Sequence, residues 1–274
     1  MLAGAGQVLA LALVSPYLVM VFTALKPAAE LRTTPPRLLP AAWQPDNLLA
    51  VLGDEAFQSW LGVSVIVAAA STALVILAAV PAAYYTARHR FRGRGAFLFL
   101  VLVTQMFAPT ALVVGLYREF FELDLINTYT ALILTNAAFN LAFAVWMLQA
   151  FFASIPREIE EAAAVDGCGR LRALLAIMLP LSLPGIVTAA IFAFIAAWNE
   201  YIVALTLMTD AARKPLTVGI TTYVTAYVQH WNLLFAASLV AIVPVVVLFV
   251  MSVPKSDTVA IVAGPSWMGM RGTF

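Results

Sequence analysis

The chain has 274 residues, of which 63% are hydrophobic and only 11% charged, and its formal net charge is +1. A soluble domain carries about a quarter charged residues and could not bury this much apolar surface in one core, so the composition favours a membrane protein with several spans. The near-neutral net charge excludes a large positive surface that would bind nucleic acid. The single Cys168 excludes an internal disulfide framework, and the two histidines, His89 and His230, are too far apart in sequence to indicate a metal site.

The first apolar segment, residues 6–25, is long enough to cross a bilayer. A secretory signal peptide would have a shorter apolar run, a basic residue ahead of it and a small-x-small cleavage site after it. Because this segment lacks the basic residue and a clear cleavage site, we expect a transmembrane helix that stays in the protein.

Further apolar stretches of spanning length follow along the chain, each bounded by charged residues, Pro or Gly. They are too long and too evenly apolar to be alternating barrel strands, which need about 10 residues. We therefore expect an all-α membrane protein, a single transmembrane domain over residues 1–274 in which Pro109, Pro184 and Pro244 kink helices. The six predicted spans are residues 6–25, 61–86, 96–116, 129–153, 182–208 and 233–253.

Basic residues predict the orientation of these spans. The short loop "RHRFRGR", residues 88–94, carries four arginines, and short loops dense in arginine stay in the cytoplasm. The acidic loop at residues 117–128 suits the outside. Both termini are then cytoplasmic, and so is the loop at residues 154–181. We interpret the arginine loop as a topological signal rather than a binding site.

The loop at residues 154–181 reads as two short helices around a turn. Ser154 is the expected N-cap of the first helix, acids follow in its first turn, and Gly167 ends it. The second helix runs from about Arg170 to residues 179–180, with one apolar face formed by Leu171, Leu174, Leu175 and Met178. A solvated hairpin is one interpretation. A docking surface for a soluble partner is the other, because small alanines permit close approach.

"EAAAVDG", residues 161–167, followed by "IMLPLSLPG", residues 177–185, resembles the EAA loop of binding-protein-dependent ABC importer permeases. "AAWNEYIVALTL" at 196–207, "VFTALKP" at 21–27 and "PDNLLAVL" at 45–52 resemble elements of carbohydrate importers. Over residues 8–252 the chain resembles the second permease subunit of a maltose-type importer, with actinobacterial amino-sugar or disaccharide importers nearest. The tail at 251–274 departs from that family's usual ending, which puts any contact of the tail with ATPases in doubt.

The resemblance implies a type I ABC importer permease fold in a bacterial cytoplasmic membrane, with a coupling helix between spans 4 and 5. It implies three kinds of protein partner beside membrane lipid: a homologous second permease in a heterodimer, two ATPase subunits, and an extracytoplasmic sugar-binding lipoprotein. ATP and Mg would bind the ATPases, since this chain has no G-x-x-x-x-G-K-[ST] loop. We therefore expect no enzyme activity, no catalytic residue and no cofactor on this chain.

The same resemblance implies roles for the residues of the coupling loop. Glu161 would pair with a basic residue on the rim of an ATPase groove, and Ala162 and Ala163 would allow close packing. Asp166 would cap the turn or bond to the partner's backbone, and Gly167 would reverse the chain.

Glu200 is the one acid within a predicted span, where acids are costly and often functional. With Trp198 and Asn199 it is a candidate to contact sugar along the substrate path. Alternatively, Asn199 and Glu200 hold helices together or face water.

Other classes of membrane protein remain as alternatives. An ABC permease for a non-sugar solute is the nearest one. A secondary transporter would need more buried coupling residues than Glu200, a channel would need a repeated pore element, and a membrane-embedded enzyme would need a catalytic pair.

Overall fold

The computed structural model describes residues 2–35, 37–225, 227 and 229–252, with side chains throughout except at residues 2–6, 8–11, 170 and 252. Regular structure in this part of the chain is helical, apart from one isolated bridge between Val224 and Gln229. The predicted all-α class is therefore confirmed. The tail that departs from the resemblance lies, from residue 253 onward, outside the described residues.

The long helices are α1 (Leu2–Ala24), α3 (Glu55–Arg88), α6 (Tyr129–Ser154), α10 (Leu183–Trp198) and α13 (Trp231–Ser252). The shorter α-helices are α2 (Asp46–Gly53), α4 (Arg94–Thr104), α5 (Pro109–Glu122), α7 (Glu158–Val165), α8 (Arg170–Ala173), α9 (Leu179–Leu181), α11 (Ile202–Leu207) and α12 (Leu216–Gly219). Three 3-10 turns, η1 (Glu30–Arg32), η3 (Ala211–Arg213) and η4 (Ile220–Tyr223), and the π-helical η2 (Leu174–Met178) complete the series.

Three of these helices, α3, α6 and α13, are each long and apolar enough to cross a membrane. Two bent helix pairs, α4 with α5 and the α8–α9 helix with α10, raise the number to five if each pair forms one span. The described side chains of α1 give an apolar stretch over Ala12–Ala24, shorter than a full span. Three to five spans are thus supported, and the sixth stays a prediction.

The predicted third span, residues 96–116, is wrong as a continuous helix. Helix α4 ends at Thr104, α5 begins at Pro109, and the two axes meet at 91°. Ala108 has an extended backbone, with φ −67° and ψ 133°, as the residue before a proline prefers. Pro109 has no N–H to continue the preceding turn, so it starts a new helix instead. The kink predicted at this proline is therefore confirmed.

The predicted fifth span, residues 182–208, is also divided. Helix α10 ends at Trp198, the chain leaves the helical path at residues 199–201, and α11 starts at Ile202. At its other end, α10 meets the preceding helix Leu171–Leu181 at an angle of 75°. Pro184, in the first turn of α10, does not break the helix that it begins.

The centre of the bundle is formed by α3, which packs along both α6 and α10. Small side chains allow the helices to approach closely, since Ala79, Ala83, Ala144 and Ala189 are all buried in the main cluster. A Cβ built on Gly185 of α10 would lie only 2.6 Å from the ring of Phe151 of α6. Glycine is therefore required where α10 crosses α6.

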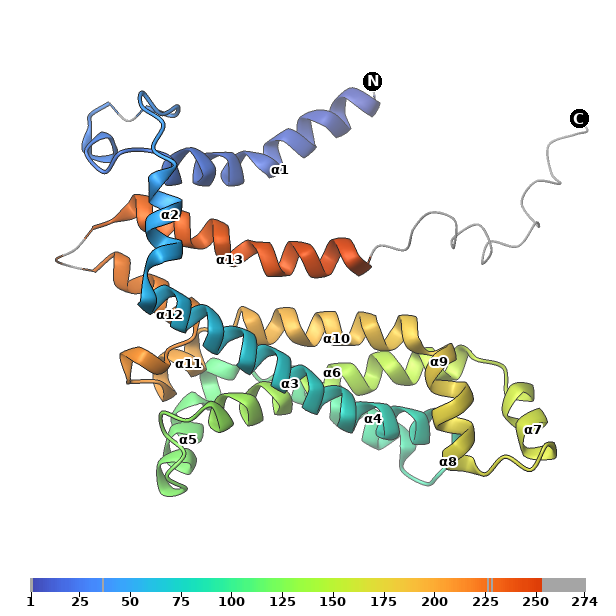
Figure 1. The fold of residues 1–274 in the computed structure, drawn as a ribbon. Coiled ribbons are helices and arrows are strands. Elements are labelled where there is room, and N and C mark those ends of the chain that lie inside the picture. Colours follow the sequence, from blue (N-terminus) through green and yellow to red (C-terminus); the bar gives the residue numbers. More distant parts are fainter. Residues whose placement is uncertain (1, 36, 226, 228, 253–274) are drawn as a thin grey trace, which may run out of the picture.

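Helix α1 lies beside α13, away from the α3–α6–α10 group (Figure 1). A buried amide network joins their ends: the Asn47 side chain of α2 donates to the carbonyls of Ala24 at 2.8 Å and Lys26 at 2.9 Å. The Asn232 amide of α13 donates in turn to Asn47 Oδ1 at 3.0 Å. Asn47 thus holds α1, α2 and α13 together.

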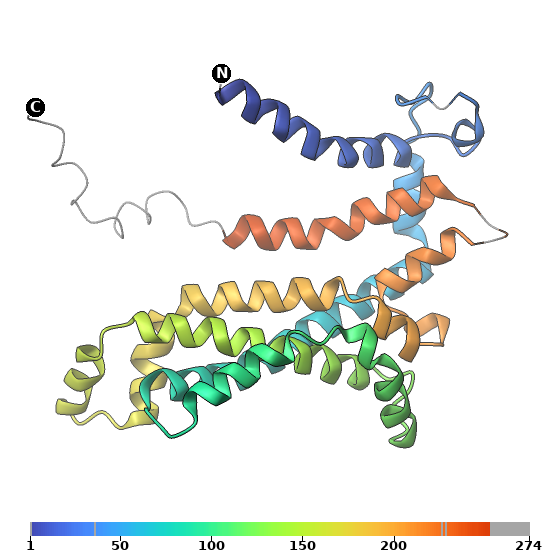
Figure 2. The same ribbon diagram turned by 180° about the vertical axis from the view of Figure 1, so that it is seen from behind.

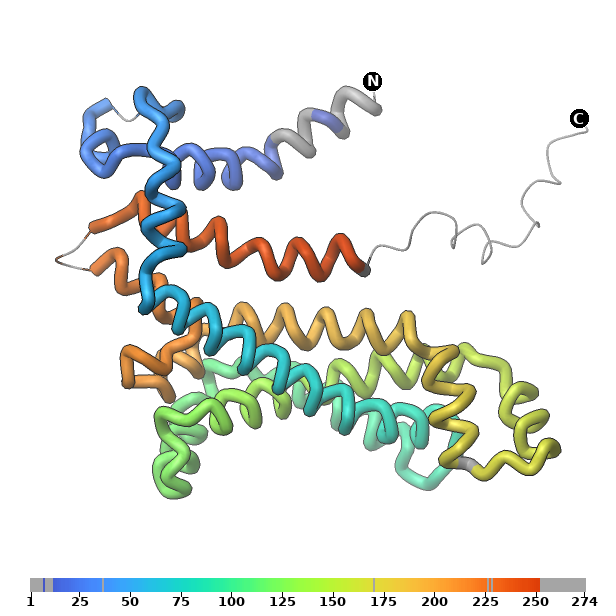
Figure 3. The backbone as a smooth tube through the Cα atoms, in the orientation of Figure 1, coloured from blue at the N-terminus to red at the C-terminus, as the bar shows by residue number. Residues whose placement is uncertain are grey.

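The two ends of the bundle differ in character. Helix α7 projects from one end, and α2, α5, α11 and α12 lie at the other, as both opposite views show (Figures 1 and 2). The ribbon shows that α1 begins on the side of the bundle where α7 lies (Figure 1), and the backbone trace shows that α13 runs toward the same side (Figure 3). Both ends of the helical body therefore lie on the side of α7.

Candidate functional site

Helix α7, residues Glu158–Val165, contains most of the predicted coupling motif. Its end has the geometry of a Schellman motif: the Cys168 N–H donates to the Ala163 carbonyl at 2.9 Å and the Gly167 N–H to the Ala164 carbonyl at 3.1 Å. Gly167 has φ +77°, which favours glycine. The predicted reversal of the chain at Gly167 is confirmed as local structure.

The start of α7 differs from the sequence prediction. Ser154 is the last residue of α6, and its Oγ donates to the Phe151 carbonyl at 2.7 Å, so it does not cap α7. Ile155 is extended (φ −76°, ψ 129°) because it precedes Pro156. The position before α7 is occupied by Arg157, whose side chain makes no cap hydrogen bond. The predicted N-cap at Ser154 is therefore wrong.

Residues spaced by four along this segment form the inner face of α7. Ile155 and Ala163 are buried, at 8% and 6% exposure, and Ile159 packs against the same apolar cluster. Ala163 is therefore buried within its own chain, in the region where α7 packs beside α8. The interpretation of Ala163 as a surface for a partner stays a prediction that this placement does not favour.

The outer face of α7 carries Glu161, Ala162 and Val165, all exposed. Val165 is 89% exposed, so its apolar side chain makes almost no contact within the described chain. Sequence reasoning missed Val165. Its spacing of four residues from Glu161 and three from Ala162 could have identified it, because residues three and four apart share a helix face. Asp166, next along the chain, is exposed as well.

The second helix of the loop runs from Leu171 to Leu181, as predicted, but its apolar face is different. Met178 is fully buried and Ala173 is 6% exposed, whereas Leu171 and Leu175 are 69% and 56% exposed. The π-helical segment η2 widens the turn, so positions that would share a face in a regular α-helix separate. The prediction that Leu171, Leu174, Leu175 and Met178 share one face is therefore wrong, since Leu171 and Leu175 are exposed and Met178 is buried.

Arg88, the last residue of α3, connects this loop to the bundle. Its Nε donates to Glu160 Oε1 at 2.7 Å, and its Nη1 donates to the Ile155 carbonyl at 3.0 Å. Its Nη2 lies 3.9 Å from Met178 Sδ. The Arg88 side chain is 6% exposed, so it is a buried side chain, in contrast to Arg90 and Arg92 in the same loop. The interpretation of the arginine loop at residues 88–94 as a topological signal did not predict the contact between Arg88 and Glu160.

A cavity of about 250 Å³ adjoins α7 beside this ion pair. Its lining combines basic and acidic side chains with small ones: Tyr84, Arg88, Arg157, Glu160, Glu161, Ala164, Cys168 and Ala173. The space separates part of α7 from the end of α3. Arg88 bridges the two elements beside a region that is not filled by side chains.

The three candidate residues of the substrate path do not face the same space. Glu200 Oε1 accepts from the Val203 N–H at 2.7 Å, and Oε2 accepts from the Ala204 N–H at 2.9 Å. Its carboxylate thus caps the start of α11, and it lines a cavity of about 10 Å³. A sugar contact by Glu200 stays a prediction, and these two bonds show a local helix cap rather than a link between helices.

Trp198 and Asn199 line a larger cavity of about 580 Å³ between α1, α10, α12 and α13. The Trp198 indole N–H donates to the Ala241 carbonyl at 3.2 Å, and its ring stacks on Phe194 with centroids 5.7 Å apart. Asn199 is exposed and its amide donates to the Ile195 carbonyl at 2.9 Å. The polar atoms in this cavity are few, since Thr217 and Ser238 are among otherwise mainly apolar neighbours.

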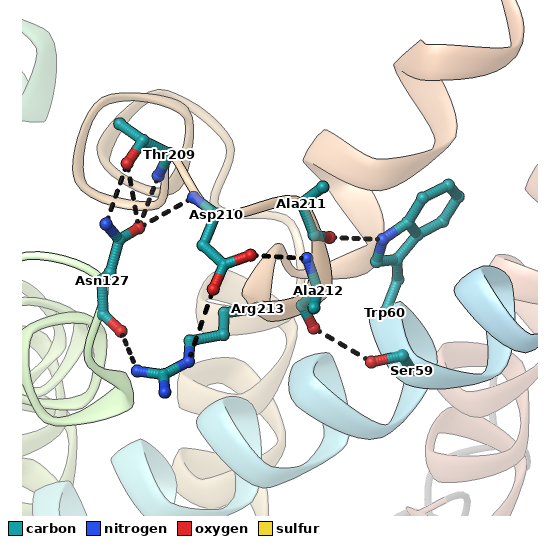
Figure 4. A network of polar contacts seen from close by, with 8 residues as sticks. All are labelled: Ser59, Trp60, Asn127, Thr209, Asp210, Ala211, Ala212 and Arg213. Carbon is teal, nitrogen blue, oxygen red and sulfur yellow. Dashed lines mark hydrogen bonds and ion pairs between the residues drawn. The ribbon is translucent and has the colours of Figure 1, made fainter.

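A polar network fixes the loops at the end opposite α7 (Figure 4). Asn127 Oδ1 accepts from the N–H groups of Thr209 at 2.7 Å and Asp210 at 2.9 Å, and Arg213 Nη1 donates to the Asn127 carbonyl at 3.0 Å. The Trp60 indole of α3 donates to the Ala211 carbonyl at 3.1 Å. The loop after α11 is therefore tied to both the α5–α6 connection and the start of α3.

Residues 75–253 match the family described as "Binding-protein-dependent transport system inner membrane component". The chain belongs to this family. The matched range includes α7, its turn and the Trp198–Glu200 segment, so both candidate sites lie within the part that defines this transport-system component. An inner-membrane component agrees with the long apolar helices α3, α6 and α13.

Relatives of this transport-system component include named permeases. The sulfoquinovosyl glycerol transport system permease protein of Agrobacterium fabrum is 37% identical over 257 residues, covering 94% of this chain and 88% of that protein. A diacetylchitobiose uptake system permease protein of Streptomyces coelicolor is 34% identical, covering 85% and 78%. The trehalose/maltose transport system permease protein of Thermococcus litoralis is also 34% identical, covering 74% of each chain.

A solved structure of another protein has the same fold as this chain. A chain of a bacterial ABC transporter involved in the import of the acidic polysaccharide alginate superposes with a TM-score of 0.78, at 22% identity. The match covers 91% of this chain and 92% of that chain. The ABC importer permease fold predicted from the sequence is therefore confirmed.

Proposed function

We propose that this chain is one of two membrane-spanning subunits of an ATP-driven importer that moves a carbohydrate across a bacterial cytoplasmic membrane. The observation that carries the proposal is the family match, joined by relatives of 34 to 37% identity whose names specify sulfoquinovosyl glycerol, diacetylchitobiose and trehalose or maltose. All of these solutes contain sugar rings. A homologous permease would complete the pathway as the second half of a heterodimer.

In this proposal the outer face of α7 docks on an ATPase subunit in the cytoplasm. The projecting position of α7 and its exposed Glu161, Ala162 and Val165 support this role (Figure 1). Glu161 would face a basic residue on the groove rim, and Val165 would bury its apolar side chain there. ATP-driven closure of two ATPases would move α7, and the bundle would then rock between inward- and outward-facing states.

ATP and Mg belong to the ATPases in this proposal. In this proposal the chain changes conformation when the ATPases bind and hydrolyse ATP, and it is not itself an enzyme. The sequence has no phosphate-binding loop of the G-x-x-x-x-G-K-[ST] type, which supports that division of roles.

The proposed topology has six spans, with α1 as the first and each bent pair as one. Both termini would be cytoplasmic, which fits the start of α1 and the end of α13 on the side of α7 (Figure 1). The arginines at residues 88–94 support this orientation, because they follow α3 at the same end of the bundle.

The opposite end of the bundle would receive a sugar-binding lipoprotein outside the cytoplasm. A related fold has been solved in complex with an alginate pentasaccharide-bound periplasmic protein, with a TM-score of 0.61 to this chain. The hydrogen bonds of Asn127 and Arg213 would hold the outer loops in shape for that partner (Figure 4). Sugar would then pass along the cavity lined by Trp198 and Asn199.

The experiment that tests the proposal is reconstitution of the chain with its second permease, ATPase and binding protein in liposomes. ATP-dependent accumulation of a labelled sugar is the expected result. Accumulation of only an amino acid or a metal would replace the sugar assignment with another solute. Uptake that continues without ATP and follows an ion gradient would overturn the importer itself and indicate a secondary transporter.

A further inference from the structure

The Arg88 side chain brings together three parts of the cytoplasmic loop with the end of the longest helix. It donates to Glu160 in α7, donates to the Ile155 carbonyl between α6 and α7, and lies against Met178 in η2. Helix α3, which ends at Arg88, has 34 residues and runs from this end of the bundle to the opposite one (Figure 1). One side chain thus joins the loop that carries α7 to a helix that spans the whole bundle.

The chemistry of the contact requires arginine. A guanidinium presents its N–H donors in a fixed planar fork, so Nε and Nη1 can address Glu160 and the Ile155 carbonyl at the same time. A lysine ammonium has a compact charge on a flexible stem and lacks this fork. Because Arg88 is 6% exposed and Glu160 is 21% exposed, solvent screens the pair less than it would a surface pair. Removal of either partner leaves a charge that is poorly solvated.

The contacts of α7 with the bundle are otherwise apolar and few. Ile159 reaches the cluster that α3 and α6 form, α7 otherwise packs beside α8, and a cavity of about 250 Å³ adjoins the helix. Apolar contacts are non-directional and permit sliding, whereas the bonds of Arg88 to Glu160 and Ile155 have fixed lengths and directions. A displacement of α7 therefore reaches α3 most directly through Arg88.

We propose that Arg88 is a positioning residue for energy coupling: it transmits the displacement of α7, driven by the ATPase, to α3 and so to the outer end of the bundle. This inference rests on the proposed docking of α7 on an ATPase. The route through Arg88 bypasses the covalent connections from α7 back to α6 and forward to α8. If the contacts of Arg88 with Glu160 and Ile155 were lost, ATP hydrolysis would continue while less solute is moved for each ATP.

The test uses the complete reconstituted importer, with its second permease, ATPase and binding protein, and measures solute imported per ATP hydrolysed. Arg88→Gln is expected to lower this ratio about tenfold, within the usual range of coupling between two sites, while the ATPase still co-purifies. Glu160→Gln should lower it in the same direction. The double variant should be no worse than Arg88→Gln alone, since both changes remove one contact. Arg90→Gln, an exposed arginine two residues on, is the matched control and should keep the wild-type ratio.

A second readout separates coupling from stability. Spin labels on α7 and on the outer end of α3, in a Cys168→Ala background, report ATP-induced movement of each element. In Arg88→Gln the α7 label should still move on ATP binding, and the α3 label should stay in place. Arg88→Lys keeps the positive charge without the planar fork of donors, so it replaces Arg88→Gln in the test if the glutamine variant does not fold. Its ratio of solute imported to ATP hydrolysed should also fall.

Two distinct results would overturn the two proposals. If Arg88→Lys or Arg88→Gln assembles and imports with the wild-type ratio of solute to ATP, Arg88 does not transmit the movement of α7, although α7 can still be the docking helix. If the wild-type chain does not bind the ATPase, the docking of α7 fails first, and the role of Arg88 fails with it.

Discussion

Ala163 and Val165 lie on opposite faces of α7: Ala163 is 6% exposed, against the bundle, and Val165 is 89% exposed, away from it. The two residues therefore predict different defects. Val165→Asp places a charge on the proposed docking face, and we expect ATPase affinity to fall roughly tenfold or more, since burial of a valine is worth about 1.5 kcal/mol or more. Ala163→Leu overfills the inner face, and we expect a lower melting temperature of the isolated subunit.

Affinity measured by titration of the detergent-solubilised subunits distinguishes these outcomes. Ala162→Asp lies on the outer face and should behave like Val165→Asp. Wild-type affinity in both outer-face variants would show that another surface holds the ATPase.

Gly167 terminates α7 with φ +77°, and a Cβ added there would meet nothing within 4 Å. Gly167→Ala should therefore cost backbone strain alone, about 1 kcal/mol, without a steric clash. Gly169→Ala is the matched control, since Gly169 also has open space around it and its φ is outside the left-handed region. Thermal unfolding of both variants gives the comparison, and equal melting temperatures would contradict the assigned helix end.

Gly219 of α12 faces the Trp60 ring of α3, and a Cβ there would lie 2.1 Å from Trp60 Cδ2. Because Trp60 is 6% exposed and its indole N–H bonds to the Ala211 carbonyl, the ring has little freedom to withdraw. Gly219→Ala should destabilise the subunit by about 1–3 kcal/mol, as overpacking does. Gly53→Ala, where a Cβ meets nothing within 4 Å, is the control. An unchanged melting temperature for Gly219→Ala would show that α12 can shift away from α3.

Glu200 and Asn199 are adjacent, but their environments predict separate effects. Glu200→Ala removes the cap of α11 and should cost about 1 kcal/mol of stability, which a thermal melt will detect. Asn199→Ala changes the wall of the cavity of about 580 Å³, so it should alter the sugar concentration that half-saturates uptake while stability stays constant. The reverse pattern, with uptake changed by Glu200→Ala at unchanged stability, would return Glu200 to the substrate path.

Local sequence signals predicted the parts of the fold that depend on local chemistry. The all-helical class follows from long apolar runs, and the turn at Gly167 follows from the glycine itself. A kink at Pro109 was predicted, but the full division of residues 96–116 and of residues 182–208 was not, because an apolar run does not report where one helix ends and the next begins. Hydropathy measures composition along the chain, and these breaks depend on hydrogen bonds.

The candidate site was predicted less completely. The motif located α7, but its inner and outer faces depend on tertiary packing, which the contact of Ile159 with the main cluster and the burial of Ala163 reveal. The Arg88–Glu160 pair joins residues 72 positions apart in sequence, a distance over which no spacing rule applies. Trp198 and Asn199 share one cavity while Glu200 lines another, because α10 ends at Trp198 and the chain leaves the helical path at residues 199–201.

The central claim is that α7 docks on an ATPase, and a pull-down from the native membrane tests it most directly. The tagged wild-type chain should recover a second permease, an ATPase and a solute-binding lipoprotein. The variant with both Glu161→Lys and Gly167→Asp should recover the second permease but lose the ATPase, because its docking face and helix end are altered while the bundle remains folded. Recovery of the ATPase at wild-type yield by this variant, or recovery of the wild-type chain without any ATPase, would contradict the account.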